Sequence, residues 1–341
     1  MASSQFKIIT SADRGAPVLN GVTGSLIPVL DFCLITGSGW LQPSASVKFN
    51  SAVDTLAVYQ QPSGSKCILY VNDAGPHATT LGKEAQVKGW ENLATMSAPL
   101  GTGSGEFPYY GQIQTNGHIC VVKSALANAT INRQWFMFVD AYTFYLFIDS
   151  GDAIGKYQSL FFGDIYSLQG PGDYKKCQIQ GKLTDNQPTV AGGDYNDSIT
   201  VMLTGIFGIN QGASGFINRS SDGRYLSNWI TKMGDFAKAI TTTPAAINSF
   251  TPMAGGVPGP NTTDKSLYLS PIFINESFGQ NSCVRGRMRG MYHLCHPIAN
   301  FSDGQTFGGI GEQFGKTFQV IKQGWNGGMW CIETSNTVET N

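Results

Sequence analysis

The chain has 341 residues, a formal net charge of −1 and 13% charged residues, about half of the ~25% that is usual in soluble domains. This balance gives little repulsion between copies and lacks the basic excess of a nucleic-acid binder, so it favours self-association and argues against DNA contact. The 42 glycines indicate many turns, and 20 Phe, 13 Tyr and 6 Trp supply a sizeable core, which excludes a disordered chain.

The first regular elements expected along the chain are a short strand and a helix. Residues 6–10 alternate like a strand. Residues 25–35 are the best helix candidate, because apolar residues recur there at i, i+3, i+4, i+7 and i+8. Ser25 can cap the start of this helix and Gly37 can end it.

Strands dominate the segment that follows. Residues 56–60 and 67–73 resemble neighbouring strands joined by a Pro/Ser/Gly turn, and residues 91–96 suggest a single helical turn. "WFMFV" (135–139) and "FYLFI" (144–148) flank a short turn and predict a hairpin. Both strands are apolar on both faces, so we expect both faces to be covered, either by a second sheet or by a subunit partner.

A polar, turn-rich stretch at 182–198 interrupts this pattern and is typical of a domain boundary or a long loop. We therefore expect an N-terminal mainly-β domain at 1–185, which contains the early helix, and a C-terminal mainly-β domain at 196–341. Residues 186–195 would be a linker or loop between them.

Two further segments shape the expected C-terminal domain. Residues 225–240 carry an apolar stripe at helical spacing, and residues 241–265 form a long uncharged loop of the kind that serves function or an interface. The whole pattern predicts a mainly β fold, built from β-sandwich or barrel-like units with two or three short helices.

The seven cysteines are scattered without CxxC spacing, which argues against a structural zinc site. The N-terminal residues lack the basic and apolar regions of a signal peptide, so we expect reduced, mostly buried thiols. The sequence has no apolar run of the ~18 residues that span a membrane, so we expect no membrane contact.

The segment "GIGEQFGKT", 309–317, has some likeness to a phosphate-binding loop. That motif needs four residues between its first glycine and Gly-Lys-Thr, and Gly311 is separated from Gly315 by three. The residues that follow alternate like a strand instead of forming the required helix. The Gly-x-Ser-x-Gly elbow of serine hydrolases is absent too. We expect a glycine turn before a strand, and no nucleotide.

A metal site is a third alternative, since Cys283, His293, Cys295 and His296 lie close together in the sequence. In an extended strand, residue 296 faces away from residues 293 and 295, so these ligands would not converge. We expect packed cysteines and hydrogen-bonded histidines, and no metal.

Five aspartates in the middle of the chain leave a glycan hydrolase open, whose mechanism needs two carboxyl groups roughly 5–9 Å apart. Each aspartate stands beside Gly, Ser, Ala or Tyr in a predicted turn, where Asp usually bonds its own backbone. We therefore expect no catalytic residue, no cofactor and no enzyme. The five are Asp140, Asp149, Asp152, Asp164 and Asp173.

The stretch "VRGRMRGMYHLCHP", 284–297, is unusually basic for this chain. At strand period, Arg285, Arg287 and Arg289 point to one side. Such a row can meet a protein partner, lie on a solvated or intramolecular face, or contact DNA phosphates. We favour a protein interface and keep the other two readings open.

The opposite side of this predicted strand would carry Met288, Tyr292 and Leu294. Gly286 and Gly290 remove side chains from the same side. We therefore expect a neighbouring backbone to approach closely there.

Three segments together resemble a group of virion structural proteins of tailed bacteriophages. They are "ITSADRGAPVLNGVTGSLIPVLDFCLITGSGW" near the start, "FMFVDAYTFYLFID" with "FFGDIYSLQGPGDYKKC" in the middle, and "RGRMRGMYHLCHPIANFSDG" late in the chain. The resemblance implies a virion protein, made in the cytoplasm of the bacterial host. The resemblance implies the neck, tail or capsid-decorating class of these proteins. The chain would act by assembly with itself and with other virion proteins, and the neck, the head–tail junction or the tail is the favoured place. The resemblance carries over no active-site residue, and the 241–265 loop departs from the pattern.

Two other functions stay open at this point. A receptor- or polysaccharide-binding tail protein would expose aromatic side chains on loops, such as Tyr109, Tyr110 and Trp325. The less favoured rival is a glycan hydrolase that uses two of the aspartates.

Overall fold

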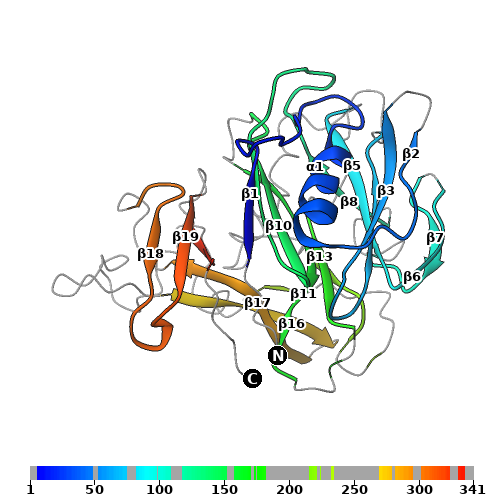
Figure 1. Ribbon diagram of the computed structural model, residues 1–341. Helices are drawn as coiled ribbons and strands as arrows, with labels where there is room; N and C mark the ends of the chain where they lie inside the picture. The colour runs from blue at the N-terminus through cyan, green and yellow to red at the C-terminus, as the bar shows by residue number, and fades with distance from the viewer. Residues whose placement is uncertain are drawn as a thin grey trace.

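The fold is mainly β, as predicted, and its described residues form several antiparallel sheets with one short α-helix (Figure 1). The computed structural model describes residues 6–48, 53–74, 82–97, 99–108, 117–151, 157–169, 173, 175–181, 215–220, 223, 232–233, 269–278, 281–294, 301–322 and 329–334. Within this part of the chain, no helix is long and apolar enough to cross a membrane.

The central sheet has six strands in the order β1-β9-β10-β11-β13-β14. The predicted hairpin is confirmed: β9 and β10 pair antiparallel, with Phe144 opposite Val139. The strands are β1 (Lys7–Thr10), β9 (Trp135–Val139), β10 (Thr143–Ile148), β11 (Gln158–Asp164), β13 (Cys177–Gln180) and β14 (Gly215–Ile217).

A five-stranded sheet, in the order β2-β3-β4-β5-β8, forms a second layer. The predicted pairing of β3 with β4 is confirmed. Its strands are β2 (Val47–Lys48), β3 (Asp54–Gln60), β4 (Ile68–Asn72), β5 (Glu84–Trp90) and β8 (Ile119–Val122).

The helical turn expected at 91–96 is wrong, because those residues form a strand, β6 (Asn92–Thr95), which pairs with β7 (Thr102–Ser104). The physical reason is packing. Leu93 lies against a small core with Trp90, and glycines at 101 and 103 let the second strand approach closely.

The third sheet follows the order β15-β16-β17-β20-β19-β18, with β12 also paired to β17. Its strands are β12 (Tyr166–Ser167), β15 (Lys232–Met233), β16 (Leu269–Phe278), β17 (Asn281–Leu294), β18 (Thr306–Gly308), β19 (Thr317–Lys322) and β20 (Met329–Glu333). A 3-10 turn, η6 (Gly311–Gln313), lies between β18 and β19.

The central sheet is the middle layer, and its two faces line two different cores. Phe144, Leu146 and Ile148 of β10 pack with side chains of β3, β4, β5 and β8. Tyr145 and Phe147 of the same strand pack with side chains of β16, β17 and β20. The strands β9 and β10 are apolar on both faces, and the sequence left open whether a second sheet or a subunit partner covers them. Sheets of the same chain cover both faces.

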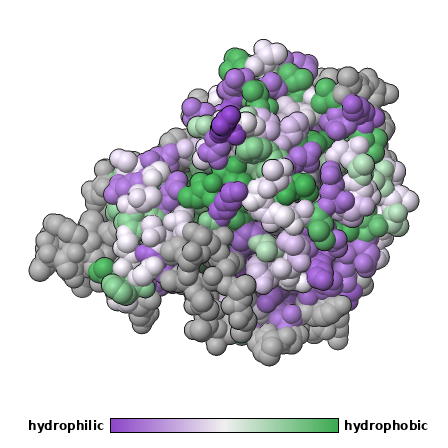
Figure 2. Space-filling model, viewed as in Figure 1, coloured by the Kyte–Doolittle hydropathy of each residue, from purple (hydrophilic) through white to green (hydrophobic). Residues whose placement is uncertain are grey.

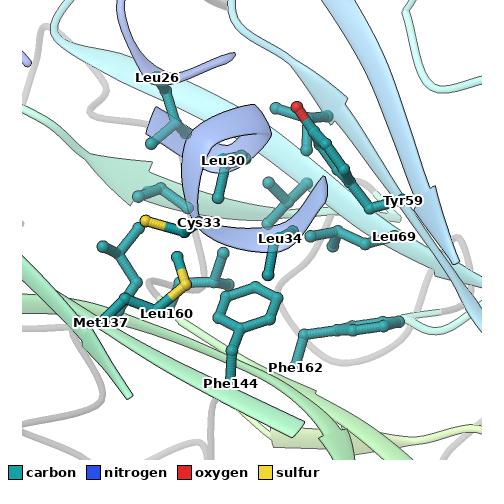
Figure 3. Close-up of a cluster of buried hydrophobic side chains, with 14 of the residues drawn as sticks. Leu26, Leu30, Cys33, Leu34, Tyr59, Leu69, Met137, Phe144, Leu160 and Phe162 are labelled. Carbon is teal, nitrogen blue, oxygen red and sulfur yellow. The ribbon is translucent and has the colours of Figure 1, made fainter. Parts of the chain in front are cut away.

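Helix α1 (Leu26–Leu30) continues into a π-helical turn, η1 (Asp31–Thr36), so the predicted helix is confirmed. It lies between β1 on one side and β3 and β5 on the other (Figure 1). Leu30, Cys33 and Leu34 point toward Met137 and Phe144 of the central sheet (Figure 3). The helix thereby belongs to the core between the two sheets.

Ser25 occupies the N-cap position of this helix, as predicted, but its side chain makes no capping hydrogen bond. Its Oγ donates to the carbonyl of Asn20 at 2.8 Å. The cap is the carboxylate of Asp73, which accepts a hydrogen bond from the backbone N–H of Leu26 at 2.8 Å. Lys123 pairs with the same carboxylate, and both side chains are fully buried.

The division into two domains stays a prediction, because residues 186–195 and 241–265 lie outside the described residues. Among the strands that the structure describes, two pairings connect the proposed halves: β14 joins β13, and β12 joins β17. Of the helix predicted at 225–240, the structure describes β15. The helix prediction is wrong for Lys232 and Met233, because these two residues form a strand that pairs with β16.

Candidate functional site

The arginine-rich strand β17 docks onto loops of the central sheet. The guanidinium of Arg285 is fully buried and forms a bidentate pair with the carboxylate of Asp173, with Nε donating at 2.7 Å. One of its NH groups also donates to the carbonyl of Arg219 at 3.2 Å. A paired, hydrogen-bonded charge of this kind joins the third sheet to the segment that follows β12.

The other two arginines stack on tyrosines, one in β12 and one in the turn between β9 and β10. The guanidinium of Arg287 lies 4.7 Å from the ring centroid of Tyr166, and that of Arg289 lies 4.6 Å from the ring of Tyr142. Arg289 also donates to Asp140 Oδ2 at 3.3 Å. All three arginines thus contact side chains or carbonyls of their own chain, which agrees with the alternative of an intramolecular face. Their role in a protein interface stays a prediction.

The alternation predicted for β17 breaks at Gly290, which has φ +60°. Met288 and Met291 share the core beneath the central sheet, whereas Tyr292 and Leu294 pack in other clusters. The placement of Tyr292 and Leu294 on the face of Met288 is therefore wrong. The left-handed residue inserts a bulge, and a bulge exchanges the two faces of a strand.

The close approach expected at Gly286 is confirmed. A Cβ on this residue would lie 2.3 Å from the carbonyl oxygen of Tyr166 in β12. The missing side chain lets β12 pair with β17 at this point. The same pairing positions Tyr166 opposite Arg287.

The described aspartates hold local structure. Asp140 accepts hydrogen bonds from the N–H groups of Tyr142 and Thr143 at 2.7 Å, and Asp149 accepts one from Gly151 at 3.1 Å. The turn role is confirmed for these two. Asp173 instead pairs with Arg285, and Asp152 lies outside the described residues.

Asp164 is a buried carboxylate at the end of β11. It accepts hydrogen bonds from Gln61 Nε2 at 3.1 Å and from the backbone N–H of Ser65 at 3.0 Å. Burial raises the pKa of this carboxyl, and the hydrogen bonds from Gln61 and Ser65 act in the opposite direction. Both donors belong to the second layer, so Asp164 connects two sheets.

The segment 309–317 is a glycine turn before a strand, as predicted: η6 occupies its middle and β19 follows. Of the suggested zinc ligands, Cys295 and His296 lie outside the described residues, as do the side chains of Cys283 and His293. Among the residues that the structure does describe, no three His, Cys, Asp or Glu side chains gather in a group that could hold a metal ion.

Large apolar side chains are exposed at the tip of the β18–β19 hairpin. Phe314 is 83% exposed and Ile310 is 54% exposed. Hydrophobic residues lie at this end of the surface, at the lower left of Figure 2. We call Ile310 and Phe314 the hairpin tip.

The hairpin tip is held by its own backbone. The N–H of Gly309 donates to the carbonyl of Lys316 at 2.7 Å, and the N–H groups of Gln313 and Phe314 each donate back three residues at 3.1 Å. Gly311 has φ +59° and Gly315 φ +84°, conformations that favour glycine. An ordered loop therefore presents Phe314 to solvent.

A second group of exposed apolar side chains, here called the upper loops, comprises Val18, Leu126 and Ile131. Their two loops are joined by a backbone bridge between Leu19 and Arg133. The upper loops lie at the top of Figure 1, far from the β18–β19 hairpin at its lower left.

The sequence pattern does not identify the hairpin tip. Its signal is a large apolar residue among glycines in "GIGEQFGKT", and that pattern does not separate an exposed phenylalanine from a buried one. Tyr109, Tyr110 and Trp325, the aromatics suggested for receptor binding, lie outside the described residues. No protein-family model matches the chain, and no curated protein matches it. The resemblance to phage virion proteins therefore remains a hypothesis.

Proposed function

We propose that the chain is a structural component of a tailed-bacteriophage virion, and that it acts by assembly with copies of itself and with other virion proteins. The observation that carries this proposal is the hairpin tip, where an ordered loop exposes 83% of Phe314. The resemblance of three sequence segments to virion proteins favours a place at the neck, the head–tail junction or the tail.

Physical chemistry supports the hairpin tip as a contact point. Burying a Phe or Ile side chain against a partner yields about 1.5–3 kcal/mol. Because the loop is already hydrogen-bonded, binding would order few additional groups, and pre-organisation of this kind improves affinity. Aromatic side chains, Phe among them, are enriched in the buried core of protein interfaces.

Two separate apolar groups favour assembly with more than one neighbour. The hairpin tip and the upper loops lie at distant ends of the molecule (Figure 1). A chain with contact points at two ends can join two partners at once. The near-neutral net charge of −1 adds little repulsion to such an arrangement.

Within the arginine row, Arg287 and Arg289 keep part of their surface, whereas Arg285 is fully buried. A partner that binds this side of β17 would therefore meet Arg287 and Arg289 together with the tyrosines beneath them. Arg287→Glu is expected to weaken assembly more than folding, as measured by particle incorporation and by the unfolding midpoint of the same protein.

The decisive experiment compares Phe314→Ser with Leu41→Ser, which removes an apolar side chain that is 52% exposed and lies in neither apolar group. The oligomer mass is measured by sedimentation over a wide concentration range, and incorporation is measured in phage particles that lack the wild-type chain. We expect Phe314→Ser to reduce both, and Leu41→Ser to leave both unchanged. A wild-type chain that stays monomeric and is dispensable for infectious particles would overturn the proposal.

A further inference from the structure

We propose that Lys123 and Asp73 form a modification site, at which the lysine amine and the aspartate carboxyl group condense into an amide cross-link and release one water molecule. The bond joins the residue after β8 to the residue after β4, two strands of the five-stranded sheet that lie on either side of β5. This inference does not depend on the proposed function, because it concerns two side chains inside the fold.

The two reacting groups already touch. Nζ of Lys123 contacts Oδ1 of Asp73, and both side chains are fully buried. Nζ also donates to the carbonyl oxygen of Val22 at 2.8 Å and to Ser25 Oγ at 3.3 Å. When the nitrogen is an uncharged amine, its two hydrogens remain on these two acceptors and its lone pair faces the carboxyl group. An amine with its lone pair in this direction can act as a nucleophile toward that group.

The carboxyl group is held through its other oxygen. Oδ2 of Asp73 accepts a hydrogen bond from the backbone N–H of Leu26 at 2.8 Å. Attack at the carboxyl carbon places negative charge on this oxygen, and a donor that is fixed there beforehand stabilises the charge. Oδ2 therefore becomes the carbonyl oxygen of the amide, and Oδ1, the oxygen beside Nζ, is the one that leaves.

The backbones of both residues are anchored by hydrogen bonds. The N–H of Asp73 donates to the carbonyl of Thr55 at 2.7 Å, and the carbonyl of Asp73 accepts a bond from the N–H of Gly24 at 3.1 Å. The N–H of Lys123 donates to the carbonyl of Lys83 at 2.8 Å. Reacting groups that a rigid frame holds in contact behave as if they were very concentrated, with effective molarities of roughly 10⁵–10⁸ M in well-oriented cases.

Burial favours the uncharged forms that react. Removal from water raises the pKa of the Asp73 carboxyl and lowers the pKa of the Lys123 ammonium, while the attraction between the two charges acts in the opposite direction. Transfer of one proton from the ammonium to the carboxylate gives an amine beside a carboxylic acid. The ion pair therefore contains both reactants within itself.

The reaction balances without any other reactant. The amine nitrogen forms a bond to Cγ of Asp73, and the bond between Cγ and Oδ1 breaks. Oδ1 keeps the proton that it received, takes a second proton from the nitrogen and leaves as water. Nothing is oxidised or reduced. Because both side chains are fully buried, the new amide is shielded from hydrolysis by bulk water.

The test is the intact mass of the purified full-length protein under denaturing conditions, followed by peptide mapping. We expect the wild-type protein to be lighter, by one water molecule, than the mass calculated from its sequence. We also expect a protease digest to contain one branched peptide in which Lys123 is joined to Asp73. A simple ion pair separates on denaturation and leaves the mass unchanged, so this measurement distinguishes the two states.

The variant Lys123→Arg retains the positive charge, but its guanidinium stays protonated and should leave the chain at full mass. Lys316→Arg is the matched control. Lys316 pairs with Glu333 at 3.0 Å and both side chains remain partly exposed, so this variant should still lose one water. The mass of the wild-type protein decides the matter even if Lys123→Arg folds poorly. A wild-type protein of full mass, or a water loss that maps to other residues, would overturn the proposal.

Discussion

The joints between the sheets and the hairpin tip use their residues in opposite ways. At the joint between β17 and the segment before β13, Arg285 is buried with Asp173, and a second ion pair, Lys123 with Asp73, is buried where helix α1 begins. At the hairpin tip, apolar groups are exposed: Phe314 and Ile310. A buried ion pair is costly to break but adds little net stability, whereas an exposed phenylalanine adds nothing to the stability of an isolated chain. The buried ion pairs fix how the parts of the fold pack. The exposed side chains can contribute favourable free energy when a partner buries them.

The largest effect on folding is expected at a joint. Asp173→Ala leaves the buried guanidinium of Arg285 without its carboxylate and should lower the free energy of unfolding by about 3–5 kcal/mol. Denaturant titration measures this loss. The double variant Arg285→Met with Asp173→Leu removes both charges and should recover most of it. If Asp173→Ala lowers the free energy of unfolding by less than about 1 kcal/mol, the buried pair is not a strong contact between the layers, and its contrast with the hairpin tip fails.

A smaller loss is expected at the bulge that reverses the faces of β17. Gly290→Ala places a Cβ at φ +60° and 2.7 Å from the ring of Phe6, and should cost about 1–3 kcal/mol. Gly304→Ala is the matched control, because Gly304 has φ +77° with no atom within 4 Å of an added Cβ. Equal losses for the two variants would show that the contact with Phe6 contributes nothing.

A pH-dependent effect is expected at Asp164. Its pKa is raised above the ordinary 3.8 by burial, so the folded chain binds more protons than the unfolded chain in the range just above that value. The stability of the wild type should therefore fall as pH rises through this range, relative to Asp164→Asn, which does not titrate. Denaturant titrations at several pH values measure the difference. A difference that stays flat, or that changes in the opposite direction, would contradict the assignment.

The smallest effect on folding is expected at the hairpin tip. Phe314→Ser should change the free energy of unfolding by no more than about 0.5 kcal/mol, because the side chain is already in water. Thermal and denaturant unfolding of the isolated protein measure this. A loss of stability comparable to that of Gly290→Ala would show that the tip is part of the fold and would erase the contrast with the joints.

Local patterns predicted the parts of the fold that depend on neighbouring residues. The β9–β10 hairpin and helix α1 follow from apolar spacing within a few residues. Contacts between distant residues were not predictable in this way. The cap of α1 comes from Asp73, 47 residues after Leu26, and the partner of Arg285 is Asp173, 112 residues before it.

The candidate site was less predictable than the fold. Period two predicted the three arginines on one side of β17, which stays a prediction, and it could not reveal the bulge at Gly290, since glycine also occurs in regular strands. The exposure of Phe314 depends on whether any other segment covers the hairpin. Residue spacing carries no information about such coverage.

The middle position of the central sheet has a consequence for synthesis on the ribosome. The face that carries Phe138, Tyr145 and Phe147 is covered by β16, β17 and β20, which are translated more than a hundred residues later. Until residue 333 has emerged, a nascent chain with a formed β9–β10 hairpin exposes these rings, and exposed apolar strands aggregate readily. We expect expression of chains truncated before β16 to yield aggregates or chaperone-bound protein, even though the first two layers are already complete.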